Sequence, residues 1–186
     1  MSTLFVDSIQ PKTTGSQLTI APAIQTGAML QTQFTQYTGT TTVSTSADTN
    51  AEISVLTVNI TPKSTSSIIK LDAHIFHEWS DQGDATNSVW FFYRDSTLLK
   101  APSAGSRPCG ISMSTLSHHT TDAGSTPEIA YYSYFDAPNT INQITYKVGV
   151  LPRYTRTIYI NRTVTDNDNN SHERGVSFIS ATEIGG

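Results

Sequence analysis

Hydrophobic and polar residues alternate with a period of two along most of this 186-residue chain. In Ile68–Trp79, every second residue from Ile69 to Trp79 is apolar or a histidine, and the residues between them are mostly polar. Successive side chains of a β-strand point to opposite sides of its sheet, so this pattern predicts a strand with one buried face. No segment repeats apolar residues at helical spacing over three turns, and no helix is predicted.

Further segments carry the same strand pattern, and short sequences rich in Gly, Pro, Asp and Asn separate them. Such residues favour turns, because Gly and Pro set the backbone and Asp and Asn bond to it. Eight or nine short strands separated in this way predict an all-β fold, an antiparallel β-sandwich or jelly roll. The further predicted strands are Met29–Tyr37, Leu56–Ile60, Ser88–Arg94, Ile111–Ser117, Glu128–Phe135, Ile144–Val150, Arg156–Arg162 and Val176–Ile184.

The first 27 residues differ from the rest of the chain. They contain two prolines, two glycines and only brief apolar alternation, which is too little to bury a core. We therefore expect residues 1–27 to form an extended arm that attaches the protein to a partner. A frayed terminus is the alternative. Residues 28–186 are expected to form the β-sandwich head domain.

The composition excludes several classes of function. Only 14% of the residues are charged and the formal net charge is −4, whereas 29 threonines and 22 serines supply most of the polarity. The basic residues never form a run, so no nucleic-acid partner is expected. No stretch reaches the ~18–20 apolar residues of a spanning helix, and the N-terminus lacks a signal-peptide pattern. No membrane partner is therefore expected.

Signatures of catalysis and of metal binding are missing from the sequence. There is no Gly-x-Ser-x-Gly, no His-Glu-x-x-His and no phosphate-binding glycine loop. The single cysteine, Cys109, has no partner for a disulfide or a structural zinc site. We expect no enzyme, no catalytic residue, no metal and no cofactor. Paired carboxylates that cleave glycosides are assembled in space, so a polysaccharide depolymerase remains an alternative.

Two predicted strands are apolar or aromatic on both faces. In Ser88–Arg94 and in Glu128–Phe135, large side chains occupy the odd and the even positions alike. An antiparallel sheet with one face in water alternates cleanly, so a second burial surface is needed. We expect that surface to be an oligomer interface, with coverage by the chain's own loops as the alternative. The interface candidates are Trp90, Phe92, Tyr131 and Phe135.

Two loops are candidates for contact with a receptor. The first combines an aromatic ring with carboxylates, the groups that hold sugars by stacking and hydrogen bonding; its residues are Trp79, Asp81 and Asp84. The second is a polar hairpin tip with Asp166, Asp168 and Asn170. Its alternating oxygen ligands resemble a calcium loop, but Ser171 and Ser177 stand where an EF-hand needs Gly and Glu. A solvated tip is therefore the preferred interpretation.

Short motifs in a fixed order connect the chain to a family. The opening Met1–Gln10 and four later segments resemble small tail-fibre-like and virion decoration proteins of marine bacteriophages, such as cyanophages and pelagiphages. The segment Gly105–Thr126 has no counterpart in that pattern. The later segments are Thr57–Ser67, Phe91–Thr97, Phe135–Val148 and Arg174–Gly186.

This resemblance implies a virion protein with a trimeric C-terminal β-sandwich. The arm would bind other virion proteins, and the head would trimerise and bind the host surface, with a cell-surface glycan as its ligand. The alternatives are a capsid decoration or head-fibre protein and, outside viruses, a carbohydrate-binding module.

Overall fold

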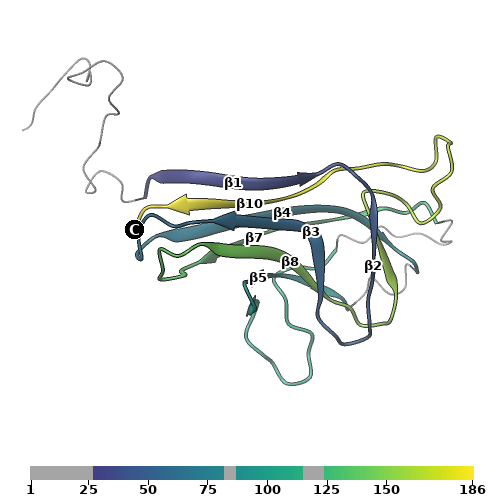
Figure 1. Cartoon of the computed structure of the whole chain (residues 1–186). Helices are drawn as coiled ribbons and strands as arrows, with labels where there is room; N and C mark the ends of the chain where they lie inside the picture. Colours follow the sequence, from purple (N-terminus) through teal and green to yellow (C-terminus); the bar gives the residue numbers. More distant parts are fainter. Residues whose placement is uncertain (1–26, 82–86, 115–123) are drawn as a thin grey trace, which may run out of the picture.

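In the computed structural model, residues 27–81, 87–114 and 124–186 are described, and they form two antiparallel β-sheets that pack against each other (Figure 1). No helix occurs among these residues. The predicted all-β sandwich is confirmed. Residues 1–26, which make up nearly all of the predicted arm, lie outside the described residues.

The larger sheet is organised around its longest strand, β4 (Ile68–Trp79). Along one side β4 pairs with β7 (Glu128–Asp136). Along the other side it pairs first with β10 (Ser177–Ile184) and then, through its last three residues, with β9 (Thr157–Ile160). The sheet ends at β1 (Met29–Tyr37) next to β10 and at β2 (Thr41–Ser44) next to β9.

The smaller sheet has the strand order β3, β8, β5, β6. Its members are β3 (Ala51–Ile60), β8 (Ile144–Leu151), β5 (Val89–Arg94) and β6 (Thr97–Leu99). Strands β2 to β5 alternate between the two sheets, and so do β7 to β9, so the chain crosses repeatedly from one layer to the other. This crossing gives the sandwich its jelly-roll-like connectivity.

Most predicted strands are present with nearly the predicted bounds, since strand periodicity is strongest in long, half-buried strands. The prediction for Ile111–Ser117 is wrong over its described part, where a single bridge joins Ser112 to Trp90. Strands β2 and β6 were not predicted, because three or four residues are too few to show a period of two.

The core lies between the two sheets and follows the predicted alternation of β4. Ile69, Leu71, Ala73 and Ile75 have no accessible surface. They face a matching row of apolar residues on the smaller sheet, among them Leu56, Val58, Tyr146, Val148, Val150, Trp90 and Phe92. Burial of these side chains is the main source of stability, at roughly 1.5–3 kcal/mol for each large aliphatic residue.

Both faces of β5 are covered within the monomer. Trp90 and Phe92 point into the core and have no accessible surface. On the opposite side, Val89 and Tyr93 are 8% exposed and Phe91 is fully buried. The prediction that Trp90 and Phe92 lie at an oligomer interface is therefore wrong.

The far side of β5 is closed by its neighbour β8 and by the chain's own loop. Gly149 lies opposite Phe91, and a Cβ at this glycine would stand 2.7 Å from the Tyr93 ring. A Cβ at Gly110 would stand 2.6 Å from Cβ of Val89. The missing side chains of these two glycines let the rings of β5 pack against β8 and let the loop lie against Val89, so this side of β5 is covered within the subunit.

A buried carboxylate fastens the sandwich near its C-terminus. Glu183 of β10 accepts hydrogen bonds at Oε1 from the Lys63 amide (2.6 Å) and the Ser67 hydroxyl (2.7 Å), and at Oε2 from Gln31 Nε2 (2.6 Å). Burial raises the pKa of this carboxyl, but the hydrogen bonds outweigh burial and bring the pKa below its ordinary value. Glu183 therefore joins β1, β10 and the β3–β4 connection in its ionised form.

We predict that Glu183→Gln lowers the free energy of unfolding at pH 7 by about 1–3 kcal/mol, because the new amide nitrogen faces hydrogen-bond donors. The stabilisation by ionised Glu183 is present above the unfolded-state pKa and is lost as pH falls through the lower folded-state pKa. The difference between wild type and variant should therefore narrow in acid. Urea unfolding from pH 7 down to about pH 3 measures it.

The matched control is Glu173→Gln, which removes an exposed carboxylate. It should leave the free energy of unfolding nearly unchanged at both ends of the series. If the free energy of unfolding lost in Glu183→Gln stays constant with pH, the stabilisation does not come from ionised Glu183.

Candidate functional site

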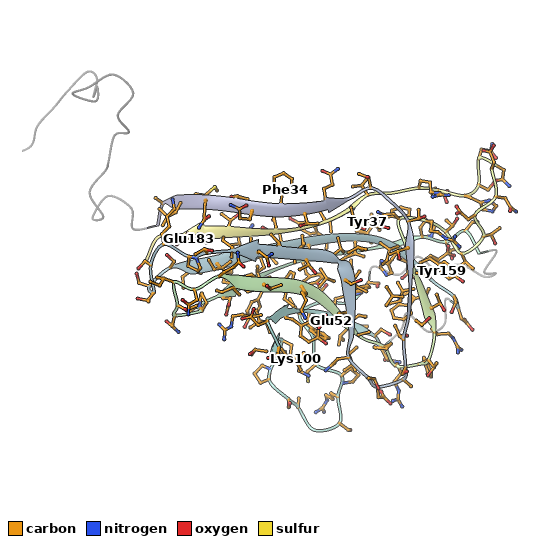
Figure 2. All side chains as sticks on the ribbon, viewed as in Figure 1. Phe34, Tyr37, Glu52, Lys100, Tyr159 and Glu183 are labelled. Carbon is orange, nitrogen blue, oxygen red and sulfur yellow. The ribbon has the colours of Figure 1, made fainter. Side chains whose placement is uncertain are left out.

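The outer face of the larger sheet carries large exposed aromatic side chains. Phe34 is 70% exposed, Tyr131 60% and Phe135 61%. The strand register places Phe178 beside His74 and His74 beside Tyr131 in one row across β10, β4 and β7. We call the surface formed by Phe34, Phe178, His74, Tyr131 and Phe135 the outer aromatic face. Figure 2 shows Phe34 projecting from β1 away from the rest of the molecule.

The outer aromatic face is ordered by its own contacts. The His74 ring stacks on Phe178 with a centroid distance of 5.7 Å and lies 6.4 Å from the Tyr131 ring. Lys70 Nζ and Asp72 Oδ2 form an ion pair at 2.8 Å within the face, and their hydrogen bond raises the pKa of Lys70. Because the two charges cancel, this pair adds no net charge to the face. Of the four predicted interface residues, Tyr131 and Phe135 are free to meet a partner.

The aromatic–acidic loop does not form the predicted sugar platform. Trp79 is only 2% exposed and packs in the core, where its Nε1 is buried without a hydrogen-bond partner. A ring enclosed in this way cannot stack on a sugar, so the prediction for Trp79 is wrong. Asp81 is exposed and lies 3.6 Å from the Arg156 guanidinium. Asp84 lies outside the described residues.

The polar tip before β10 is divided between anchoring and exposed residues. Asp166 pairs with Arg162 at 3.3 Å and with Arg174 at 2.7 Å, so its carboxylate holds the loop together. Whether Asp166, whose side chain is 22% exposed, also contacts a receptor stays a prediction. Asp168 and Asn170 are exposed as predicted. In the described part of the chain, no group of three or more His, Cys, Asp or Glu side chains is placed to hold a metal ion.

A buried serine and histidine lie within hydrogen-bond distance in the core. Trp90 Nε1 donates to Ser114 Oγ (3.0 Å), which lies 2.8 Å from His77 Nε2. His77 Nδ1 lies 3.1 Å from the Ile75 carbonyl oxygen. Because indole only donates and a carbonyl only accepts, His77 carries its proton on Nδ1 and accepts from Ser114. In the sequence, burial of His77 was indicated only by its place on the inward-facing positions of β4.

This serine–histidine pair is sealed. His77 has no accessible surface and Ser114 is 8% exposed. Burial lowers the pKa of His77 to about 4. Glu128 Oε2 lies 3.7 Å from His77 Nε2, and burial, followed by the charge of Glu78, raises the pKa of Glu128 to about 7. The hydrogen bonds run from Trp90 through Ser114 and His77 to the Ile75 carbonyl oxygen, so they satisfy polar groups inside the core. Because both side chains are buried, the pair offers no exposed nucleophile.

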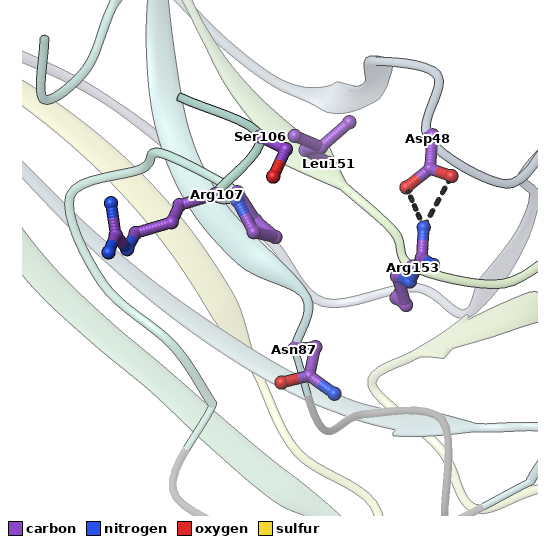
Figure 3. A pocket seen from close by; sticks show the side chains of 7 residues that line it. Asp48, Asn87, Ser106, Arg107, Leu151 and Arg153 are labelled. Carbon is purple, nitrogen blue, oxygen red and sulfur yellow. Dashed lines mark hydrogen bonds and ion pairs between the residues drawn. The ribbon is translucent and has the colours of Figure 1, made fainter. Parts of the chain in front are cut away.

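A cleft of about 570 Å³ lies at the end of the smaller sheet (Figure 3). It opens between the β2–β3 loop, the start of β5, the loop after β6 and the end of β8. Figure 3 shows Arg153 paired with both carboxylate oxygens of Asp48 on one side and Arg107 on the other. No sequence motif indicated this cleft, because its side chains come from four separate segments. They are Asp48, Asn87, Ser106, Arg107, Pro108, Leu151 and Arg153.

No protein-family model matches this sequence, and no curated protein matches it. The described residues include no helix of the length and apolarity that a membrane crossing requires. A proposal for function therefore rests on the sequence motifs, the fold and the outer aromatic face.

We predict that Glu128→Gln changes the pH dependence of stability. The folded-state pKa of Glu128 is raised from 4.5 to about 7, so its contribution is fully present below pH 4.5 and is lost as pH rises to 7. Glutamine does not ionise, so the variant should gain stability relative to wild type over that window, by up to about 3 kcal/mol. Urea unfolding at a series of pH values measures the difference.

The titration of His77, which lies next to Glu128, gives a second effect on the pH dependence of stability. Its pKa is lowered from 6.5 to about 4, so its contribution is present above pH 6.5 and is lost as pH falls. Between pH 4.5 and 6.5, Glu128 and His77 change the free energy of unfolding of wild type in opposite directions. The Glu128→Gln variant keeps only the loss of stability that His77 causes as pH falls. If the free energies of unfolding of wild type and Glu128→Gln change in parallel with pH, the assignment of a neutral, buried Glu128 beside a neutral His77 is wrong.

Proposed function

We propose that this chain is a structural and adhesive protein of a bacteriophage particle, of the tail-fibre type, which assembles as a homotrimer through the outer aromatic face. The observation that carries the proposal is the exposure of Phe34, Tyr131 and Phe135 on one side of one sheet. The bacteriophage assignment is supported by the ordered sequence motifs, and the all-β sandwich agrees with what those motifs imply.

The exposed rings supply a driving force for association. A large aromatic side chain presents about 150–250 Å² when fully exposed. Covering the exposed part of each of the three rings is worth roughly 2–4 kcal/mol at about 25 cal/mol per Å². Apolar patches of this kind on a soluble protein mark an interaction surface.

A second copy of this chain suits the outer aromatic face better than a strongly charged partner does. The Lys70–Asp72 ion pair is internal to the face, so two copies would meet without net repulsion from these residues. The aromatic rings at β1 and β7 flank the small polar residues of the central row, Ser180 and Ser133. Three such faces around a three-fold axis would bury their rings against one another.

The two ends of the head support different roles. Gly27 N–H donates to the Gly185 carbonyl (2.6 Å), so the described head begins beside Gly185. The exposed tip with Asp168 and Asn170 lies at the opposite end of β10 (Figure 1). In the proposed function, the arm binds other virion proteins at one end and the loops of the other end contact the host surface. Binding by three copies raises avidity over that of a single site.

The related alternative is a decoration or head-fibre protein of the capsid, which the same motifs resemble. Electron microscopy of particles labelled with an antibody to this chain distinguishes the two by position. Signal on the tail supports the fibre, and signal on the capsid supports decoration. Absence of the chain from purified particles would overturn both.

We predict that the double variant Tyr131→Ser, Phe135→Ser converts a trimer into a monomer. Both side chains lie on β7 and are more than half exposed in the single subunit, so their loss removes interface area without opening the core. Sedimentation velocity at micromolar concentration should give three times the 20.2 kDa chain mass for wild type and the chain mass for the variant.

The control is Tyr154→Ser, which removes an exposed aromatic ring from the β8–β9 loop, away from the outer aromatic face. It should leave the trimer intact. A wild-type monomer at this concentration, or a trimer unaffected by the double variant, would exclude assembly through this face.

A further inference from the structure

The larger sheet has two long edge strands, β1 and β7. Both β10 and β7 pair with residues 69–74 of β4, so they lie on opposite sides of it, and the order across the sheet is β1, β10, β4, β7. Within the described residues, the backbones of residues 32–36 in β1 and 129–135 in β7 bond to one neighbouring strand only. About every second amide and carbonyl of these segments therefore points away from the sheet.

Strand β3 of the smaller sheet does not close the edge of β1. Thr35 Oγ1 donates to the Thr57 carbonyl (2.6 Å), and Gln31 Nε2 donates to the Thr61 carbonyl directly after β3 (2.7 Å). The Gln31 and Thr35 side chains share the inner side of β1, opposite to that of Phe34. β3 therefore lies beneath β1, as Figure 1 shows, and not beside its outer edge.

The edges of β1 and β7 lack the features that keep a strand from pairing with another chain. The other strands that end a sheet are protected: β2 and β6 have four and three residues, and β3 carries the Glu52–Lys147 ion pair and a shift in register. β1 and β7 have nine residues each and no proline. β1 has no charged residue, and the two acidic residues of β7, Glu128 and Asp136, lie buried at its ends. Long, uncharged edges of this kind are typical sites of strand addition.

Strand direction matches the edge of β7 to the edge of β1 in a second copy. From β1 through β10 and β4 to β7, each strand is antiparallel to the one before it, so β7 runs opposite to β1. A three-fold axis along the strands preserves their direction and their height. β7 of one copy would therefore meet β1 of the next as an antiparallel pair.

The register places complementary side chains opposite each other. Through β10 and β4, Phe34 of β1 stands level with Ser133 of β7. Because rotation about the axis preserves height, Phe34 of one copy would face Ser133 of its neighbour. Ser133 is small and exposed, and the exposed rings of Tyr131 and Phe135 project from the same face on either side of it. The Phe34 ring thus meets a gap between two rings, within reach of both.

We propose that the outer edge of β7 pairs with the outer edge of β1 in the next copy of this chain, so that Phe34 inserts between Tyr131 and Phe135 of its neighbour. This inference rests on the proposed homotrimer and specifies how its subunits join. The pairing satisfies backbone groups of both edges and turns all three outer aromatic faces towards the axis. It uses a different edge on each partner, and such an interface forms a closed ring when the rotation closes.

The test is disulfide formation between Phe34→Cys and Ser133→Cys, combined in one chain that also carries Cys109→Ser. Both positions are exposed in the single subunit, so neither change opens the core. Opposite residues of an antiparallel pair lie about 4.5–5.5 Å apart at Cβ, close enough for a disulfide after a small shift. Oxidation with copper phenanthroline should give a covalent species of three chains on a non-reducing gel, and each single-cysteine variant should remain a single chain.

The matched control combines Phe34→Cys with Ile129→Cys, on the same face of β7 but four residues from Ser133. Four residues of a strand span about 13 Å, which a disulfide cannot bridge, so this pair should not crosslink. Crosslinking of both pairs, crosslinking of neither in reduced protein that sediments as a trimer, or covalent dimers of a single-cysteine variant would overturn the strand pairing.

Hydrogen exchange of the wild type, followed by mass spectrometry of peptides, gives a second measurement that needs no substitution. If the edges pair, nearly all amides of residues 32–36 and 129–135 should exchange slowly; if only the rings touch, about every second one should exchange fast. Fast exchange in a wild type that sediments as a trimer overturns the strand pairing and leaves the proposed function standing. A wild-type monomer overturns both.

Discussion

Burial of the inner face of β4 against the smaller sheet is the interaction on which the other features of this protein depend. β4 pairs with β7, β10 and β9, and its inward row from Ile69 to Ile75 has no accessible surface. Since side chains on a strand alternate, fixing that row also fixes which residues of the neighbouring strands face water. The exposure of Tyr131 and Phe135 on β7 is therefore a direct consequence of core packing. A one-residue slip in register would bury them and expose the core.

Buried polar groups are tolerated in this core because nearly all of them form hydrogen bonds. Several of these bonds connect neighbouring segments at the two ends of the sandwich. Glu183 fastens the end that holds the C-terminus through three hydrogen bonds. Glu78, near the other end of β4, accepts from the Thr126 amide and hydroxyl and from the Val164 amide. At the same end as Glu183, since both residues pair with Ile69 of β4, Asp136 accepts from Arg94 and from the hydroxyl of Tyr146. Glu128 differs, because its Oε2 has no hydrogen-bond donor, and burial therefore favours its neutral form.

The outer aromatic face and the cleft of Figure 3 differ in shape and chemistry. The outer aromatic face combines exposed rings with small polar residues and an ion pair that cancels its own charge, which suits contact with a protein surface. The cleft is concave and is lined by Asn87, Ser106 and the Asp48–Arg153 ion pair, so it offers hydrogen-bonding groups where the outer aromatic face offers rings.

Periodicity in the sequence was sufficient to predict the all-β class, most of the strands and the inward row of β4, because a pattern of period two depends only on local backbone geometry. It also led to Tyr131 and Phe135 as interface candidates, and both side chains are exposed, while their contact with a partner stays a prediction. The sequence could not distinguish β5 from β7, since both are aromatic on two faces. That distinction came from tertiary packing: the Phe91 and Tyr93 rings pack at Gly149 of the adjacent strand and the loop at Gly110 lies against Val89, whereas Tyr131 and Phe135 of β7 stay exposed. The sequence likewise gave no sign of the cleft, because its residues come from four segments that only the crossing of the chain between layers brings together. Local pattern therefore determined which residues form strands, and long-range packing decided which of their faces remain free to bind.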